Sequence, residues 1–108
     1  MTQYEKLYPK LKYLFSAYFH QDWKVVYDWQ GEKPSFQAVV YDFKNSNPKE
    51  TVVKAIQELE QLLKQDLTED DLSEILSNQL GSEIYVSGLG LTYRGWLKAI
   101  LTILKERQ

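Results

Sequence analysis

The sequence predicts an all-α protein, a small bundle of about five helices in one domain that spans residues 1–108. Apolar residues recur at helical spacing in five separate segments. Typical helix-starting residues precede most of these segments, and the connections are short, as in helical bundles. The sequence also allows a short extended segment near residues 25–29 or 83–86, where β-branched and aromatic residues gather.

The first two helices are predicted near residues 9–19 and 36–43. Pro9 suits a first turn, where its missing N–H costs nothing. The apolar positions of the first helix are Leu7, Leu11, Leu14, Phe15 and Tyr18. In the second helix, Ser35 is the expected cap and residues 45–47 the expected end; β-branched residues leave a strand as the alternative. Its apolar face comprises Phe36, Val39, Val40 and Phe43.

The third helix has a strong start signal and runs to Lys64. Asn47 is the expected N-cap, Pro48 the first helical residue, and Glu50 the partner in a capping box. Six residues form a wide apolar stripe, namely Val52, Ala55, Ile56, Leu59, Leu62 and Leu63. This stripe predicts a helix that is buried along one side.

The last two helices are predicted after Thr68 and after Thr92, each acting as an N-cap. The first of the two ends near Leu80-Gly81, and residues 83–91 are irregular or briefly extended. Its inward residues are Leu72, Ile75 and Leu76. The final helix buries Trp96, Leu97, Ile100, Leu101 and Leu104.

Composition and charge argue against several classes of protein. The net charge is −2 and the pI is about 5.4, whereas nucleic-acid binders usually carry a basic stripe. The absence of cysteine excludes disulfides, thiolate metal sites and a cysteine nucleophile. No apolar run reaches the roughly 18 residues that a membrane span needs, and the N-terminus does not resemble a signal peptide. We therefore expect a cytoplasmic protein.

The segment YFHQDW gathers the only histidine of the chain among aromatic and polar residues: Tyr18, Phe19, His20, Gln21, Asp22 and Trp23. A metal site needs several converging donors, and one histidine without cysteine cannot supply them. A catalytic triad would need a nucleophile that nothing in the sequence indicates. We expect a structural corner, in which Asp22 accepts backbone N–H groups and Trp23 packs into the core.

The segment SGLGL, residues 87–91, contains two glycines but lacks the spacing and the lysine of a phosphate-binding loop. A loop that requires positive φ is the simpler interpretation. We therefore predict no nucleotide site and no cofactor.

An acidic run follows the third helix and contains no basic residue: Asp66, Glu69, Asp70, Asp71 and Glu74. Charges in the first turn of a helix are favoured by the helix dipole, so a solvated helix start would explain them. Alternatively, they form an anionic surface that steers a basic partner. The spacing excludes an EF-hand.

The order of segments resembles the immunity proteins of bacterial contact-dependent growth inhibition systems. The opening YPKLKYLFSAYFHQDW is similar to the family's tyrosine-proline start and its FHQDW block. The segments FQAVVYDF, PKETVVKAIQELEQLL, LTEDDLSEIL and TYRGWLKAILTIL follow in the family's order, the last with Tyr93, Trp96 and Leu97 in an aromatic-x-x-Trp-Leu ending. The chain departs from the family at SGLGL.

The resemblance implies a cytoplasmic inhibitor that binds the toxic C-terminal domain of a cognate effector, often a nuclease. It implies no enzyme activity, metal, cofactor, nucleic acid, membrane or small-molecule substrate. Because the FHQDW block is shared by immunity proteins against different toxins, we expect it to serve the common fold. The acidic run is then the predicted partner-binding surface, since a nuclease has a basic substrate groove.

Two alternatives from other classes stay open. One is a small metal-dependent hydrolase built on His20 and neighbouring carboxylates. The other is a helical nucleic-acid-binding module that uses Lys98, Lys105 and Arg107 on the last helix.

Overall fold

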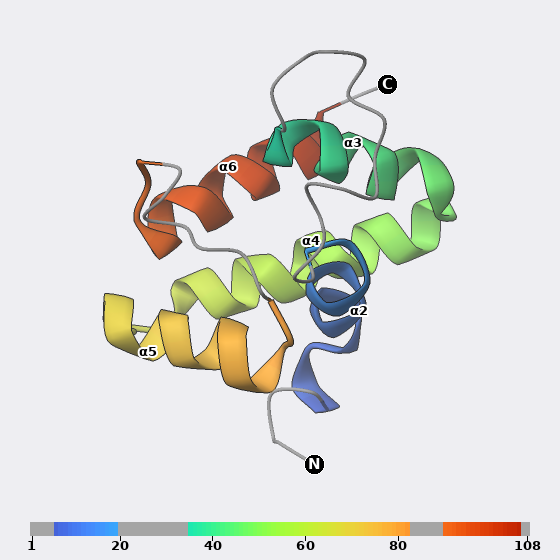
Figure 1. The fold of residues 1–108 in the computed structure, drawn as a ribbon. Helices are drawn as coiled ribbons and strands as arrows, with labels where there is room; N and C mark the ends of the chain where they lie inside the picture. Colours follow the sequence, from blue (N-terminus) through green and yellow to red (C-terminus); the bar gives the residue numbers. More distant parts are fainter. Residues whose placement is uncertain (1–5, 20–34, 83–89, 107–108) are drawn as a thin grey trace.

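The computed structural model describes residues 6–19, 35–82 and 90–106. Within these ranges the chain forms α-helices and no strand, which confirms the all-α prediction. The helices are α2 (Pro9–Tyr18), α3 (Phe36–Ser46), α4 (Lys49–Lys64), α5 (Glu69–Glu74) with the π-helix η1 (Ile75–Gln79), and α6 (Tyr93–Lys105). Figure 1 shows α4 crossing the middle of the molecule. The predicted extended segments near 25–29 and 83–86 lie outside the described residues.

Helices α4 and α6 pack side by side in opposite directions (Figure 1). The start of α4 lies near the end of α6, where Val52 and Leu104 line a common groove. The end of α4 lies near the start of α6, where Arg94 contacts the carbonyl of Leu63. Helix α3 packs on α6, and α2 packs on α4, so every long helix buries one face.

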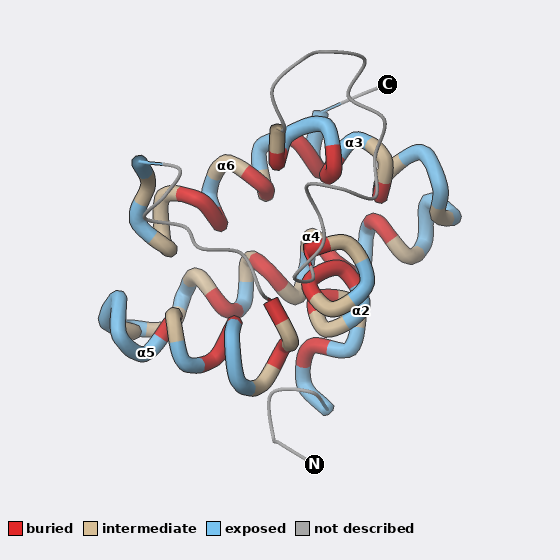
Figure 2. The backbone as a smooth tube through the Cα atoms, in the orientation of Figure 1, coloured by how far each residue is buried: buried red, intermediate tan, exposed pale blue. Residues whose placement is uncertain are grey.

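The core is centred on Trp96 of α6, which is fully buried. Its ring packs edge-to-face against Phe19 at 5.1 Å between centroids and lies 5.6 Å from Phe15 and 6.2 Å from Phe36. These rings come from α2, the residue after it, and α3. One tryptophan therefore joins three parts of the chain, and Figure 2 shows the buried residues of the helices turned towards one another.

Local caps start three of the helices, as the sequence predicts. The Ser35 hydroxyl accepts a hydrogen bond from the Ala38 N–H, and the Thr92 hydroxyl accepts one from the Gly95 N–H. Each cap satisfies one of the N–H groups that have no partner within the helix. The third cap, Thr68, is described with the acidic surface below.

The predicted N-cap of α4 is wrong by one residue. Pro48 is the N-cap, and the helix begins at Lys49. Asn47 precedes a proline, which favours an extended backbone, and its φ and ψ are −127° and 153°. Its side-chain amide turns back and donates hydrogen bonds to the Phe43 carbonyl and the Tyr18 hydroxyl.

Two apolar positions differ from the prediction. Leu7 precedes α2 and is 51% exposed, while Tyr8 is buried in its place. In α6, Leu101 is only partly buried, and Ile103 lies in the core. The helical period identified the buried faces but not their edges.

Gly81 ends the α5–η1 helix with a φ of +80°, as predicted for this position. A Cβ atom here would lie 3.0 Å from the Cβ of Ser16 in α2. The glycine therefore permits both the left-handed turn and the close approach of the two segments.

The N-terminus of α2 has a cap that comes from another helix. The Glu58 carboxylate of α4 accepts hydrogen bonds from the N–H groups of Lys10 and Leu11, at 2.9 and 3.1 Å. Burial raises the pKa of this half-buried carboxyl group, and the two backbone hydrogen bonds oppose that rise. Glu58 therefore joins α4 to α2 at the cost of burying part of a charge.

Candidate functional site

The five carboxylates of the acidic run are all exposed and lie along the α4–α5 connection and α5. We call these residues the acidic surface: Asp66, Glu69, Asp70, Asp71 and Glu74. They differ in what they bind. Two make structural hydrogen bonds within the described part of the chain, and three make none.

Asp71 belongs to a capping box at the start of α5. Its carboxylate accepts a hydrogen bond from the Thr68 N–H at 3.0 Å, and its own N–H donates to the Thr68 hydroxyl at 3.1 Å. This reciprocal pair satisfies two N–H groups at the helix start. The expectation that Thr68 opens a helix is confirmed, and Asp71 is tied to that helix.

Glu69 caps a different helix from the one in which it lies. Its carboxylate oxygens accept hydrogen bonds from the N–H groups of Tyr93 and Arg94, at 2.6 and 3.1 Å. These groups form the N-terminus of α6, where the helix dipole favours a negative charge. Glu69 therefore fixes the start of α6 against α5.

Arg94 of α6 binds carbonyl groups at the end of α4 and in the connection that follows it. Its guanidinium group donates to the carbonyls of Leu63, Gln65 and Leu67, at 3.1, 3.4 and 3.0 Å. A cation is favoured at a helix C-terminus, where carbonyls lack partners. Charges of both signs thus hold together the three helix ends that meet beneath the acidic surface.

Three carboxylates of the acidic surface remain available for a partner: Asp66, Asp70 and Glu74. Each is exposed, and none forms a hydrogen bond or an ion pair within residues 6–19, 35–82 and 90–106. Electrostatic attraction to a positive surface would therefore not have to break a contact with the described part of the chain.

The structure describes two of the six residues of the YFHQDW segment. Phe19 is fully buried and packs on Trp96, and the half-buried Tyr18 packs edge-to-face on Phe43 at 5.4 Å. Burial raises the pKa of the Tyr18 phenol, as does its hydrogen bond with Tyr13. His20, Gln21, Asp22 and Trp23 lie outside the described residues.

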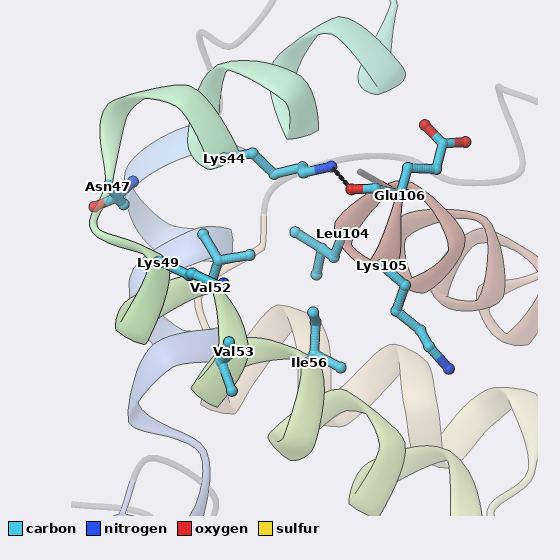
Figure 3. Close-up of a pocket in the computed structure, with 9 residues that line it drawn as sticks. All are labelled: Lys44, Asn47, Lys49, Val52, Val53, Ile56, Leu104, Lys105 and Glu106. Atoms are coloured by element: carbon cyan, nitrogen blue, oxygen red, sulfur yellow. Dashed lines mark hydrogen bonds between the residues drawn. The ribbon is translucent and has the colours of Figure 1, made fainter. Parts of the chain in front are cut away.

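A second surface, which the sequence analysis missed, is a groove of about 850 Å³ where the ends of α3 and α6 meet the start of α4 (Figure 3). We call it the lysine groove. Its floor is apolar, and its rim carries three lysines. The lining residues are Lys44, Asn47, Lys49, Val52, Val53, Ile56, Leu104, Lys105 and Glu106.

One lysine of the groove already has a structural role. The Lys44 ammonium of α3 donates to the carbonyls of Ile103 and Glu106, each at 2.7 Å, and so caps the C-terminus of α6. The Tyr41 hydroxyl donates to the Glu106 carboxylate at 2.5 Å, and this hydrogen bond raises the pKa of the phenol. Both contacts fix the end of α6 against α3.

The sequence held a weak signal for this groove. Val53 follows Val52 directly, so only one of the two can face the core, and Val53 is 40% exposed. Val53 is thus an apolar residue beside Lys49 on an otherwise polar face of the helix. It indicates a contact surface only once Leu104 and Lys105 are known to lie next to it. That placement depends on the packing of α4 on α6.

The alternative functions gain no support from the described residues. No group of three or more His, Asp or Glu side chains among them is placed to hold a metal ion. His20, on which the hydrolase hypothesis depends, lies outside them, as does Arg107. Lys105 of the nucleic-acid hypothesis forms an ion pair with Glu60 at 3.3 Å. None of the described helices is long and apolar enough to cross a bilayer.

The chain belongs to the CdiI immunity protein family, whose model matches residues 7–104. Its fold is similar to that of a chain in the crystal structure of a CdiA-CT/CdiI complex from Y. kristensenii 33638. The TM-score is 0.80 and the sequence identity 27%, over 92% of this chain and 99% of that chain. No curated protein sequence matches the chain.

Proposed function

We propose that this chain, acting as one domain over residues 1–108, binds the toxic C-terminal domain of a cognate contact-dependent growth inhibition effector and neutralises it. Membership of the CdiI immunity protein family is the observation that carries this proposal. The similarity to a chain from a CdiA-CT/CdiI complex supports it, because that protein is found with such a domain. The site of action is the cytoplasm of the producing cell.

The proposed mechanism is steric and needs no catalysis by the immunity protein. The bound protein covers the active site or the substrate groove of the toxin through an interface of about 1,600 Å² in total. A nuclease toxin would present a basic groove, because its substrate is a polyanion. Asp66, Asp70 and Glu74 supply a complementary negative surface, and they form no hydrogen bond with any residue that the structure describes.

Association kinetics with the inactivated toxin domain test the role of the acidic surface. Asp70→Lys should lower the association rate constant about threefold at low salt, and Asp70→Lys with Glu74→Lys about tenfold. The difference from wild type should shrink as salt screens the charges. Glu50→Lys is the matched control, because Glu50 is also exposed and in the first turn of a helix, at the opposite end of α4.

Two results would contradict different parts of the proposal. If the wild-type protein neither binds the toxin domain nor protects cells that express it, the immunity function itself is wrong. If it binds and protects, but the Asp70 and Glu74 variants associate at the wild-type rate, the acidic surface is only solvated and the toxin docks elsewhere.

A further inference from the structure

We propose that the lysine groove is a second docking site for the same toxin domain, and that it takes an aliphatic side chain flanked by carboxylates. This inference rests on the proposed function, because it names a contact of the partner that the function requires. The groove lies at the opposite end of α4 from the acidic surface (Figure 1). Its chemistry is also opposite in charge.

The floor of the groove fits an aliphatic side chain. Figure 3 shows Val52 and Ile56 on α4 facing the part of α6 that carries Leu104, with Val53 at the edge of the groove. Val52 and Leu104 are nearly buried, whereas Val53 is 40% exposed at the edge. A partner side chain placed here would cover apolar surface that the fold leaves in water, which is favourable in proportion to its area.

The rim determines the charge of the occupant. Lys49 is exposed and forms no ion pair with any described residue. Among the described residues, Lys105 pairs with Glu60, and this ion pair is exposed. Exposed ion pairs contribute little to stability, so a partner carboxylate can take over Lys105 at small cost. Lys44 already binds the carbonyls at the end of α6, so it contributes to the groove only through its positive electrostatic potential. Glu106 also lines the groove, but its carboxylate accepts a hydrogen bond from the Tyr41 hydroxyl. Three lysines against one carboxylate leave the rim positive, so the groove favours an acidic segment.

The acidic surface alone makes an incomplete interface. Its free residues are all carboxylates, whereas the centres of protein interfaces are depleted in charge and depend on buried apolar or aromatic anchors. The lysine groove supplies the missing apolar part. We therefore assign two roles: the acidic surface speeds encounter, and the groove slows dissociation.

One partner can reach both surfaces. Val53 and Lys64 are eleven residues apart in α4, which corresponds to about 17 Å along the helix axis. A standard interface buries about 800 Å² on each partner, which corresponds to a patch about 32 Å across. The part of the separation that lies along α4 therefore fits within a single interface of ordinary size.

The test measures binding of the catalytically inactivated toxin domain of the cognate effector to groove variants of the full chain. Val53→Ala should raise the dissociation rate constant about fivefold with little change in the association rate constant. Lys49→Glu should raise the dissociation rate constant about tenfold and also lower the association rate constant, because it reverses a charge at the rim. Lys54→Glu is the matched control, since Lys54 is an exposed lysine on α4 that does not line the groove. Thermal unfolding of each variant checks that the fold is retained.

The outcomes separate this inference from the function on which it rests. If wild type binds the toxin domain and the groove variants dissociate as slowly as wild type, the groove is not a docking site, although the immunity function stands. Equal effects of Lys49→Glu and Lys54→Glu would also overturn the inference, because a general charge effect would then explain both. If wild type does not bind the toxin domain, the proposed function fails and the inference fails with it.

Discussion

The two ends of α6 are held by charged residues of opposite sign from two other helices. Glu69 of α5 binds the N–H groups at the start, and Lys44 of α3 binds the carbonyls at the end. Each charge matches the helix dipole at the end that it caps. The ends also border the two candidate surfaces, the acidic surface at the start and the lysine groove at the finish.

The two ends differ in how much of the contact is sheltered from water. At the start, Arg94 donates to three carbonyls in partly buried positions, and Glu69 accepts a hydrogen bond from the Tyr93 N–H. At the finish, the Lys44 hydrogen bond to the Ile103 carbonyl is partly buried, whereas the contacts of Glu106 with Lys44 and Tyr41 are exposed, as are those of Glu69 at the start. Charged residues that cap a helix end have a structural role. A charged residue is therefore a candidate for partner binding only once it is known not to cap a helix end.

The largest effect is expected at the sheltered end. Arg94→Ala should lower the free energy of unfolding by about 2 kcal/mol, because it removes charged hydrogen bonds and leaves carbonyl groups without a donor. Urea denaturation measures the change. Lys98→Ala on the same helix is the control, since Lys98 is exposed, and should cost far less. Equal losses for the two variants would show that Arg94 is not a structural cap.

A smaller effect separates two neighbouring carboxylates of the acidic surface. Glu69→Ala should cost about 1 kcal/mol, the usual value for a lost N-terminal cap, because Tyr93 and Arg94 lose their acceptor. Asp70→Ala should cost little, because Asp70 makes no hydrogen bond within the described chain. Thermal and urea unfolding of both variants compares them. A larger loss for Asp70 than for Glu69 would reverse our division of the surface.

The exposed end of α6 should be less sensitive still. Lys44→Met should cost about 0.5 kcal/mol, because solvent can replace part of the contact with the Ile103 and Glu106 carbonyls. Lys49→Met should leave the free energy of unfolding unchanged, since Lys49 has no internal partner among the described residues. The same denaturation assay compares the two. A cost at Lys44 as large as that at Arg94 would remove the contrast between the ends.

The sequence was sufficient for features that depend on residues close together in the chain. The caps Ser35, Thr68 and Thr92 were predicted, and each bonds an N–H group three residues away. The buried faces followed from the helical period. Asn47 was predicted wrongly because Pro48 has an extended ψ of 152°, which moves the helix start to Lys49, and the Asn47 side chain bonds back to Phe43 of the preceding helix.

The long-range caps could not be predicted from the sequence. Glu58 bonds residues 47 and 48 positions away, and Lys44 bonds a carbonyl 59 positions away. No local pattern distinguishes these side chains from the solvated lysines and glutamates beside them. The same holds for the two candidate surfaces. The acidic surface could be predicted because its residues are close together in the sequence, whereas the groove forms only when three helices pack together.

The smallest expected effect concerns Glu58, which, like Glu69, is a carboxylate that caps a helix to which it does not belong. Because burial raises its pKa above the ordinary value, the folded protein holds the proton more tightly than the unfolded chain does. Its contribution to stability is therefore fully present below the unfolded pKa and is lost as pH rises through the folded value.

Glu58→Gln keeps an oxygen that can accept from the Lys10 and Leu11 N–H groups and removes the titration. Relative to this variant, the wild-type protein should lose on the order of a few tenths of a kcal/mol between pH 4 and pH 7, since solvent screens the half-exposed carboxylate. Urea denaturation at the two pH values measures the difference. Glu58→Ala should instead be less stable than wild type at both pH values, because α2 loses its cap. If wild type gained stability over Glu58→Gln with rising pH, the dipole of α2 would outweigh burial, and Glu58 would cap its helix as cheaply as exposed Glu69 caps α6.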